Sequence, residues 1–138
     1  MNETILSNIA EGTHAGNLSR VLEAAVTTRY LLARTGSGTD GILVGTATDL
    51  PVGVITDEGA IGDVVNVALL GSAASTRLVV ANGNIAAGRL IVASTAGKVV
   101  ALPSAPGSYF VVGQAITAAA NGGLVEFDPC VPYQRVVS

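Results

Sequence analysis

The sequence is short of the residues that carry most protein chemistry. It has no tryptophan, one histidine and one cysteine, and 12% of its 138 residues are charged, whereas an ordinary soluble domain is about 25% charged. Its seven Lys and Arg residues are spread singly along the chain, and with ten Asp and Glu they leave a formal net charge of −3. A surface without a basic stripe does not suit a phosphate backbone, so we expect no nucleic-acid partner. The hydrophobic content of 49% excludes a disordered chain.

The scarcity of histidine and cysteine excludes the commonest catalytic and metal sites. His14 is the single histidine and lies far in sequence from Cys130. The two residues therefore provide no Ser-His-Asp or Cys-His arrangement and too few ligands for zinc. The glycine-rich loop 36–41 lacks the Gly-Lys-Ser/Thr ending of a phosphate-binding loop. We predict that the protein is not an enzyme and has no metal and no cofactor.

Long apolar runs and targeting signals are also missing. No stretch approaches the roughly 18 consecutive apolar residues of a membrane-spanning helix. The start of the chain, MNETILSNIAEGTH, has neither the basic nor the apolar region of a signal peptide, and one cysteine forms no internal disulfide. We expect that the protein is synthesised in the cytoplasm and does not associate with a membrane.

The pattern of apolar residues predicts an all-β fold. From Arg29 onward, short apolar runs alternate with Gly, Pro, Asn and Asp about every eight to twelve residues, which is typical of a small β-sandwich or barrel. Residues 18–138 are predicted to form a single β-rich domain, in which Pro103, Pro106 and Pro129 interrupt strand ladders. The predicted strands are 30–34, 42–46, 52–56, 64–70, 77–81, 89–93, 98–102, 109–117, 124–128 and 133–137.

The first part of the chain follows a different pattern. Residues 1–17 show no sustained hydrophobic period, and we predict an extended N-terminal arm. A possible short helix follows, because the spacing of one helix face is matched by Leu18, Val21, Leu22, Ala25 and Val26. The β-branched residues 26–28 favour a strand instead.

Segments 52–67 and 112–127 resemble each other. Each begins with Val-Gly, continues through Ile-Thr, and has glycine before a second apolar run; matching them in this way requires one inserted residue. One interpretation is a pair of similar strand-loop-strand units within one domain. Chance similarity between two hairpins rich in Gly and Val explains the match equally well.

A chain with few charges and no evident chemistry suits one component of a larger assembly, where uncharged surface is covered. Several segments support this interpretation, because in their order they resemble the capsid cement, or head-decoration, proteins of tailed bacteriophages. The resemblance runs from about Gly12 to the C-terminus, including DPCVP at 128–132. The segments are TDLPVGV (48–54), VNVALLG (65–71), IAAG (85–88), AGKV (96–99) and VGQAIT (112–117).

The resemblance implies a structural virion protein on the outer surface of the capsid, synthesised in the host cytoplasm. Such a protein binds the major capsid protein, clamps neighbouring subunits of the expanded shell against internal DNA pressure, and associates with itself as a trimer at three-fold positions. If the arm and the residues after it carry the capsid contact, the candidate contact residues are His14, Arg20, Arg29, Tyr30 and Arg34. A locally packed N-terminus explains the same residues without a partner.

Two other functions fit the sequence less well. A carbohydrate- or peptide-binding β module needs exposed aromatic platforms, and the chain has three tyrosines and two phenylalanines. A small hydrolase would have to use the carboxylates of Asp57, Glu58 and Asp63, which share one predicted loop.

Overall fold

The computed structural model describes residues 16–72 and 75–138. These residues form ten strands and one 3-10 turn, with no α-helix among them, so the predicted all-β fold class is confirmed. Residues 1–15 of the predicted arm, including His14, lie outside the described residues. The strands are β1 (Asn17–Leu22), β2 (Leu31–Thr35), β3 (Gly41–Val44), β4 (Gly53–Ile55), β5 (Val64–Leu69), β6 (Arg77–Val80), β7 (Leu90–Ala93), β8 (Val99–Ala101), β9 (Gly107–Ala115) and β10 (Leu124–Val137), with the turn η1 (Thr95–Gly97) before β8.

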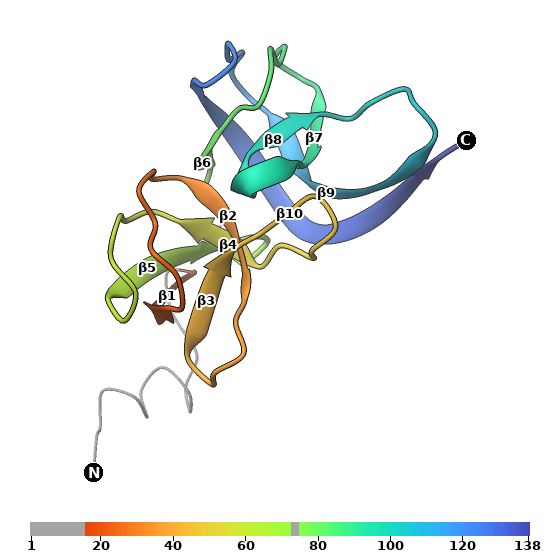
Figure 1. The fold of residues 1–138 in the computed structure, drawn as a ribbon. Helices are drawn as coiled ribbons and strands as arrows, with labels where there is room; N and C mark the ends of the chain where they lie inside the picture. The colour runs from red at the N-terminus through yellow and green to blue at the C-terminus, as the bar shows by residue number, and fades with distance from the viewer. Residues whose placement is uncertain (1–15, 73–74) are drawn as a thin grey trace.

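The strands form two five-stranded sheets (Figure 1). Strands β1 to β5 close into a barrel in the order β1-β3-β2-β4-β5, because β5 returns to pair with β1. Strands β6 to β10 form a second sheet in the order β6-β10-β9-β7-β8. Within the barrel, β1 and β3 are parallel and the other neighbours are antiparallel. An isolated parallel bridge between Ala81 and Val99 brings the end of β6 beside β8.

The predicted strands between residues 30 and 128 are confirmed, with bounds that differ from the prediction by a few residues. The possible helix over residues 18–26 is wrong, because Asn17–Leu22 form β1 and Val26 makes an isolated bridge with Gly59. β1 pairs with β5 along its length, from Asn17 opposite Ala68 onward. Pairing with a strand distant in sequence overrides the weak local preference for a helix.

The last two predicted strands are one continuous strand of 14 residues, β10. The ladder with β9 is nevertheless interrupted near Pro129, as predicted: Pro129 still lies opposite Gly113, and pairing resumes with a shifted register at Tyr133. Proline is tolerated here because β6 pairs only with Leu124–Phe127 of β10. Beyond Phe127 the strand pairs on one side, and an edge strand accommodates a residue without a backbone N–H.

The second sheet repeats the topology of the barrel strand by strand. β6 to β10 occupy the positions of β1 to β5, since each neighbouring pair in one sheet has a counterpart in the other. The bridge between Ala81 and Val99 corresponds to the pairing of Leu22 with Ile42 in β1 and β3. We call residues 16–72 the first unit and residues 75–138 the second unit. The resemblance between 52–67 and 112–127 is thus part of a five-strand repeat, which aligns Gly53 with Gly113 and needs no inserted residue there.

The hydrogen bonds between loops repeat as well. In the first unit, Val26 and Gly59 exchange two backbone hydrogen bonds of 2.8 and 2.9 Å. In the second unit, Ile85 and Ala119 exchange a pair of the same lengths at the corresponding position. A coincidence between two hairpins does not extend to the loops that flank them, so the two units share one fold.

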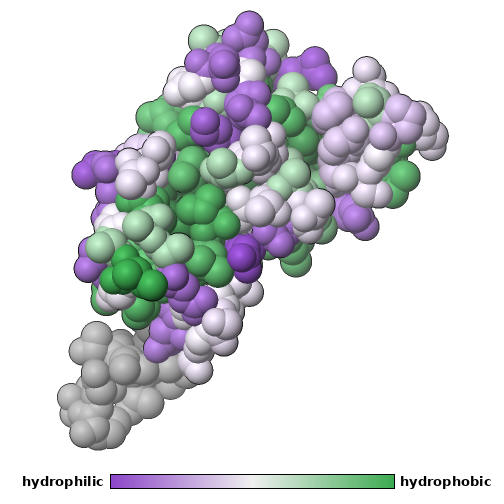
Figure 2. All heavy atoms as spheres, in the orientation of Figure 1, coloured by the Kyte–Doolittle hydropathy of each residue, from purple (hydrophilic) through white to green (hydrophobic). Residues whose placement is uncertain are grey.

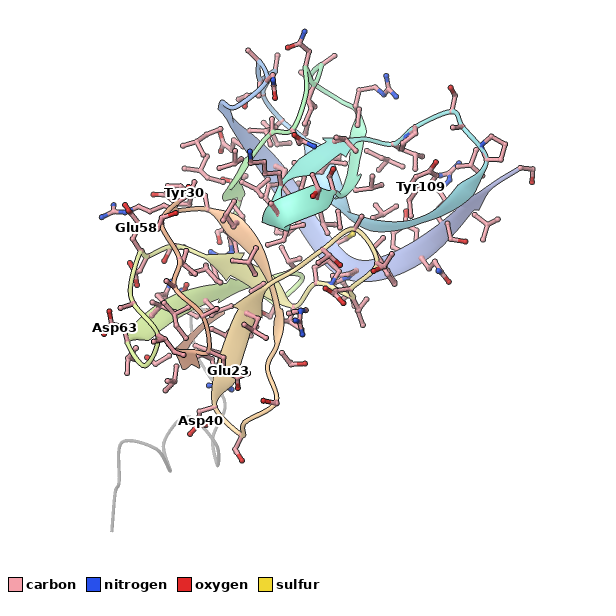
Figure 3. All side chains as sticks on the ribbon, viewed as in Figure 1. Glu23, Tyr30, Asp40, Glu58, Asp63 and Tyr109 are labelled. Carbon is pink, nitrogen blue, oxygen red and sulfur yellow. The ribbon has the colours of Figure 1, made fainter. Side chains whose placement is uncertain are left out.

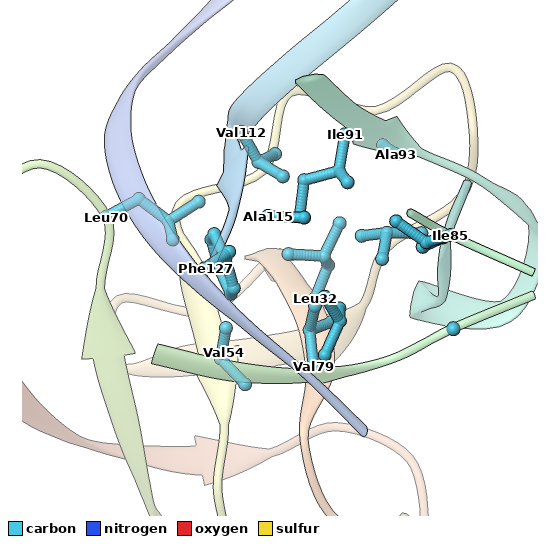
Figure 4. Packing of buried hydrophobic residues seen from close by; sticks show 13 residues of the cluster. Leu32, Val54, Leu70, Val79, Ile85, Ile91, Ala93, Val112, Ala115 and Phe127 are labelled. Atoms are coloured by element: carbon cyan, nitrogen blue, oxygen red, sulfur yellow. The ribbon is translucent and has the colours of Figure 1, made fainter. Parts of the chain in front are cut away.

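The two units also share a hydrophobic core. The larger buried cluster fills the inside of the second unit and includes Leu32, Val54 and Leu70 of the first unit (Figure 4). Phe127 is fully buried at its centre. A smaller cluster fills the barrel of the first unit. Because side chains of one unit complete the core of the other, the units pack as one body.

Candidate functional site

The structure does not gather the candidate contact residues named from the sequence into one patch. Two of the arginines are held by ion pairs within the chain. Arg29 lies 3.7 Å from the Glu58 carboxylate, and both side chains are more than half exposed. Arg34 lies 3.2 Å from Asp49. The Asp49 carboxylate also accepts hydrogen bonds from the hydroxyl and the backbone N–H of Thr46, which lower its pKa, with a smaller contribution from Arg34.

The other two described candidates have different surroundings. Tyr30 is half-buried against the larger core cluster, with a left-handed φ of 66°, and its carbonyl accepts a hydrogen bond from Val80 of the second unit. Its position is therefore at the junction of the units. Arg20 lies on β1 and donates to the Ser19 carbonyl at 2.8 Å. Arg20 also lines a hollow in the first unit, described below.

The three carboxylates considered for a hydrolase have structural partners. Asp57 accepts the backbone N–H of Asn66 at 2.8 Å, and Asp63 accepts that of Ala60 at 2.8 Å. Glu58 pairs with Arg29. Figure 3 shows Glu58 near Tyr30 at one end of the barrel and Asp63 at its side, so these two carboxylates lie apart. Among residues 16–72 and 75–138, no group of three His, Cys, Asp or Glu residues is arranged to hold a metal ion.

Glu23 is an acidic residue that the sequence analysis did not single out. Its carboxylate accepts the backbone N–H of Gly38 at 2.8 Å and that of Ser37 at 2.9 Å, and these two hydrogen bonds are the main causes of its lowered pKa. A Cβ atom on Gly36 or Gly41 would collide with the Glu23 side chain. The glycine-rich loop 36–41 is therefore closed around a carboxylate of the same chain, which leaves its N–H groups unsuited to a bound phosphate.

Cys130 lies in the irregular part of β10 and is partly buried. Burial raises the pKa of its thiol. Its Sγ is 4.0 Å from the Val111 carbonyl oxygen, a weak contact for a thiol donor. A protonated, partly buried thiol is a poor nucleophile, so this position is a packing position.

The ends of β9 and β10 form the most exposed apolar feature of the second unit. Residues 107–111 of β9 and 133–137 of β10 pair with each other, and we call them the C-terminal ribbon. Figure 1 shows the ribbon continuing from the second sheet toward the C-terminus, and β7 pairs with only Val111 of it. Beside the ribbon Val131 is 71% exposed, and within it Val136 is 69% and Tyr133 is 45% exposed.

The ribbon also has an open strand edge. Within the described part of the chain, β10 has no strand partner other than β9 beyond Phe127. An open edge with exposed apolar side chains is a site where another chain can bind, and an isolated two-stranded ribbon is only marginally stable in water. A sequence signal existed, because the segment after Asp128 has one charged residue, Arg135, in ten.

A second open feature is a hollow of about 280 Å³ at one end of the barrel. We call it the first-unit mouth. Apolar side chains of four different strands or their flanks line it, with a few polar ones at the rim. Its lining includes Leu18, Arg20, Thr35, Ile42, Val52 and Leu69.

The surface as a whole is weakly charged. Figure 2 shows apolar surface over the first unit that is interrupted by isolated polar residues. No helix that could cross a membrane occurs in residues 16–72 and 75–138.

Comparison with known proteins identifies a similar fold. No family model matches the sequence, and no curated protein matches it. A solved structure described as the head fiber gp8.5 N base in bacteriophage phi29 is similar over 83% of this chain and 93% of its own, with a TM-score of 0.66. The sequence identity is 21%, so the likeness is one of fold.

Proposed function

We propose that this chain is a structural protein of a tailed-bacteriophage virion that binds the outside of the head and reinforces the expanded shell. The observation that carries the proposal is the fold likeness to the base of a phage head fiber, over most of both chains. The ordered series of segments that resembles head-decoration proteins supports it independently. The low charge and the two open apolar features suit a component whose surface is covered in an assembly.

The C-terminal ribbon is the surface that we propose to contact the major capsid protein. It projects from the body, it has an open edge, and Val131, Tyr133 and Val136 present apolar area that gains from burial. Burial of apolar area contributes about 25 cal/mol per Å². A shell subunit that pairs with the edge of β10 would satisfy the backbone groups at the same time.

Clamping follows from attachment at several points. We propose that three copies associate at three-fold positions of the shell, so that three ribbons bind neighbouring capsid subunits together. Each ribbon adds an interface no larger than the standard size of about 1,600 Å². Once one ribbon is bound, the others are held at a high effective concentration beside their sites, and separation of the shell subunits then requires all contacts to break.

The residues named from the sequence have a secondary place in this proposal. Arg29 and Arg34 already have acidic partners in the chain, and Tyr30 is part of the junction between the units. A capsid contact by these residues would have to break existing interactions. His14 lies outside the described residues, and its proposed contact rests on the family resemblance alone.

The test uses expanded, undecorated shells assembled from the major capsid protein encoded in the same genome. The purified protein is mixed with these shells, and the sedimented fraction is measured against protein concentration. We expect saturable binding that Val136→Lys weakens strongly, because the lysine places a charge in an apolar contact. Ile61→Lys is the matched control, since Ile61 is 71% exposed on a different hairpin.

Three results would contradict the proposal in different ways. Absence of saturable binding by the natural protein would reject capsid attachment. Equal binding by the Val136→Lys and Ile61→Lys proteins would reject the ribbon as the contact surface. Specific binding to a glycan array, without binding to shells, would favour the carbohydrate-binding module.

A further inference from the structure

The two units contact each other, so the chain contains an interface between two copies of one fold. The outer face of β2 and β4 in the first unit covers the inside of the second unit. Leu32 and Val54 lie on that outer face, and Figure 4 shows both in the cluster that contains Val79 of β6. All three side chains are at least 98% buried.

The contact is closely packed at the turn before β8. Gly97 of η1 has no room for a side chain, because an added Cβ would lie 2.7 Å from Val44 Cγ1 and 2.9 Å from Leu31 Cβ, both in the first unit. Its left-handed φ of 73° also favours glycine. One face of the fold is thus shaped to receive another face of the same fold.

The repeat places the same receiving face on the first unit, where it is open. The strand registers align Val79 with Arg20, Ala93 with Thr35, and Val112 with Val52. The three second-unit residues are buried in the shared core. Their three first-unit counterparts line the first-unit mouth, which no other part of the described chain fills.

The opposite face of the second unit is open in the same way. The registers align Leu32 with Leu90 and Val54 with Gln114. Leu90 is half-buried and Gln114 is exposed, so this outer face of β7 and β9 covers nothing within the described chain. Within residues 16–72 and 75–138, each molecule therefore has one receiving face left open, on its first unit, and one inserting face left open, on its second unit.

Both open faces carry more polar residues than the two faces that meet inside the chain. Inside the chain, Val79 belongs to the same buried cluster as the apolar residues Leu32 and Val54. At the aligned positions, Arg20 would meet Leu90 and Gln114. Gln114 donates through Nε2 to the Gly88 carbonyl at 3.0 Å, and its side-chain oxygen is directed to no donor in the described residues. That oxygen is a suitable acceptor for the guanidinium of Arg20. Faces that are exposed before assembly are more polar than a permanent core.

We propose that the first-unit mouth of one molecule receives the outer face of β7 and β9 of a second copy of this chain, in a contact that repeats the one between its own two units. The contact is head-to-tail, so it closes into a ring if the rotation between copies allows. A ring of three molecules would hold six units in one circle. The inference concerns copies of this chain and does not depend on binding to a shell.

The experiment is sedimentation velocity and equilibrium of the purified full chain, up to about 1 mM protein. We expect reversible association of the natural protein. Gln114→Lys should weaken it about tenfold or more, because the lysine would face Arg20 across the interface. The double variant Arg20→Glu with Gln114→Lys should restore association by exchanging the charges. Ile61→Lys, which adds the same charge at a 71% exposed side chain outside both faces, should have no effect.

Other outcomes would overturn the inference. A natural protein that stays monomeric over the whole range excludes the contact. If Gln114→Lys and Ile61→Lys weaken association equally, the interface lies elsewhere. The same conclusion follows if the double variant does not restore association. Circular dichroism of every variant establishes that each is folded. A protein that binds shells as a monomer would retain the proposed capsid attachment but lose both the proposed three-fold association and this inference.

Discussion

Gly53 and Gly113 occupy the same place in the two units. At both positions a side chain is blocked by a carbonyl oxygen of the neighbouring strand, and the two blocking residues, Ala68 and Asp128, are also aligned in the repeat. A Cβ on Gly53 would lie 2.6 Å from the oxygen of Ala68, and one on Gly113 would lie 2.2 Å from the oxygen of Asp128. The second obstacle is also equivalent, since it is Val67 in the first unit and Phe127 in the second. The repeat thus preserves a close approach of two strands.

Replacement of either glycine by alanine should destabilise the protein. Gly113→Ala is expected to lower the free energy of unfolding by about 1–3 kcal/mol, because backbone atoms cannot give way without distorting β9 and β10. Gly45→Ala is the matched control: Gly45 is buried too, but its nearest obstacle is 3.6 Å away. Urea unfolding followed by circular dichroism measures both. Equal stability of the two variants would contradict the close approach.

The charge of Glu23 should stabilise the loop 36–41 in a pH-dependent way. Hydrogen bonds from Gly38 and Ser37 lower the pKa of the folded carboxyl below its ordinary value of 4.5. The stabilisation is therefore present above the ordinary pKa and is lost as the pH falls through the lowered value. Glu23→Gln should lower the melting temperature at pH 7, and the difference from the natural protein should shrink in acid.

Asp40→Asn is the control for this prediction, because it removes a carboxylate from the loop to which Glu23 is hydrogen-bonded. Figure 3 shows Asp40 and Glu23 at the same end of the barrel. Thermal unfolding at a series of pH values compares the three proteins. The hydrogen-bonded carboxylate is not the cause if the difference in melting temperature between Glu23→Gln and the natural protein stays constant into acid. The same holds if Asp40→Asn lowers the melting temperature in the same way.

The shared core should make the two units unfold together. Leu32 is 1% exposed and belongs to the first unit, yet packs in the cluster that fills the second. Leu32→Ala is expected to cost about 2–5 kcal/mol and to leave a single unfolding transition. Leu50→Ala, at a side chain that is 55% exposed, should change stability by less than about 0.5 kcal/mol. Two separate transitions in calorimetry of the natural protein would refute a shared core.

Cys130 should react slowly with thiol reagents while the protein is folded. Burial raises the pKa of the thiol, so a smaller fraction is thiolate at pH 8 than in an unfolded chain. We expect the rate of iodoacetamide alkylation, followed by mass spectrometry, to rise strongly when urea unfolds the protein. A folded protein that reacts as fast as the unfolded chain would contradict the assignment of Cys130 as a packing position.

Most strands were predictable because their signals are local. Apolar runs such as 64–70 are bounded by Gly, Asp and Ser, and the structure places β5 at Val64–Leu69. β1 was not predictable in this way, since the spacing of Leu18 and Leu22 also fits a helix, and only pairing with β5 decides between them. The continuity of β10 through Pro129 was not predictable either, because whether a strand tolerates proline depends on whether its other edge is paired.

Half of the internal repeat was visible in the sequence and half was not. Residues 52–67 and 112–127 keep glycines that close packing requires, such as Gly53 and Gly113. In the rest of the repeat the aligned residues differ in chemistry, for example Arg20 and Val79, because one unit's mouth is covered and the other's is open. The contact surfaces were hidden for the same reason, since exposure of Val131 and Val136 is a property of the fold.

The most direct test of the proposed function is a difference cryo-electron map of expanded phage heads with and without this protein bound. Attachment to the outside of the head predicts extra density on the outer surface at three-fold positions, into which the two-unit fold can be placed with its C-terminal ribbon against the major capsid protein. Identical maps at saturating protein, or extra density only inside the shell, would contradict it.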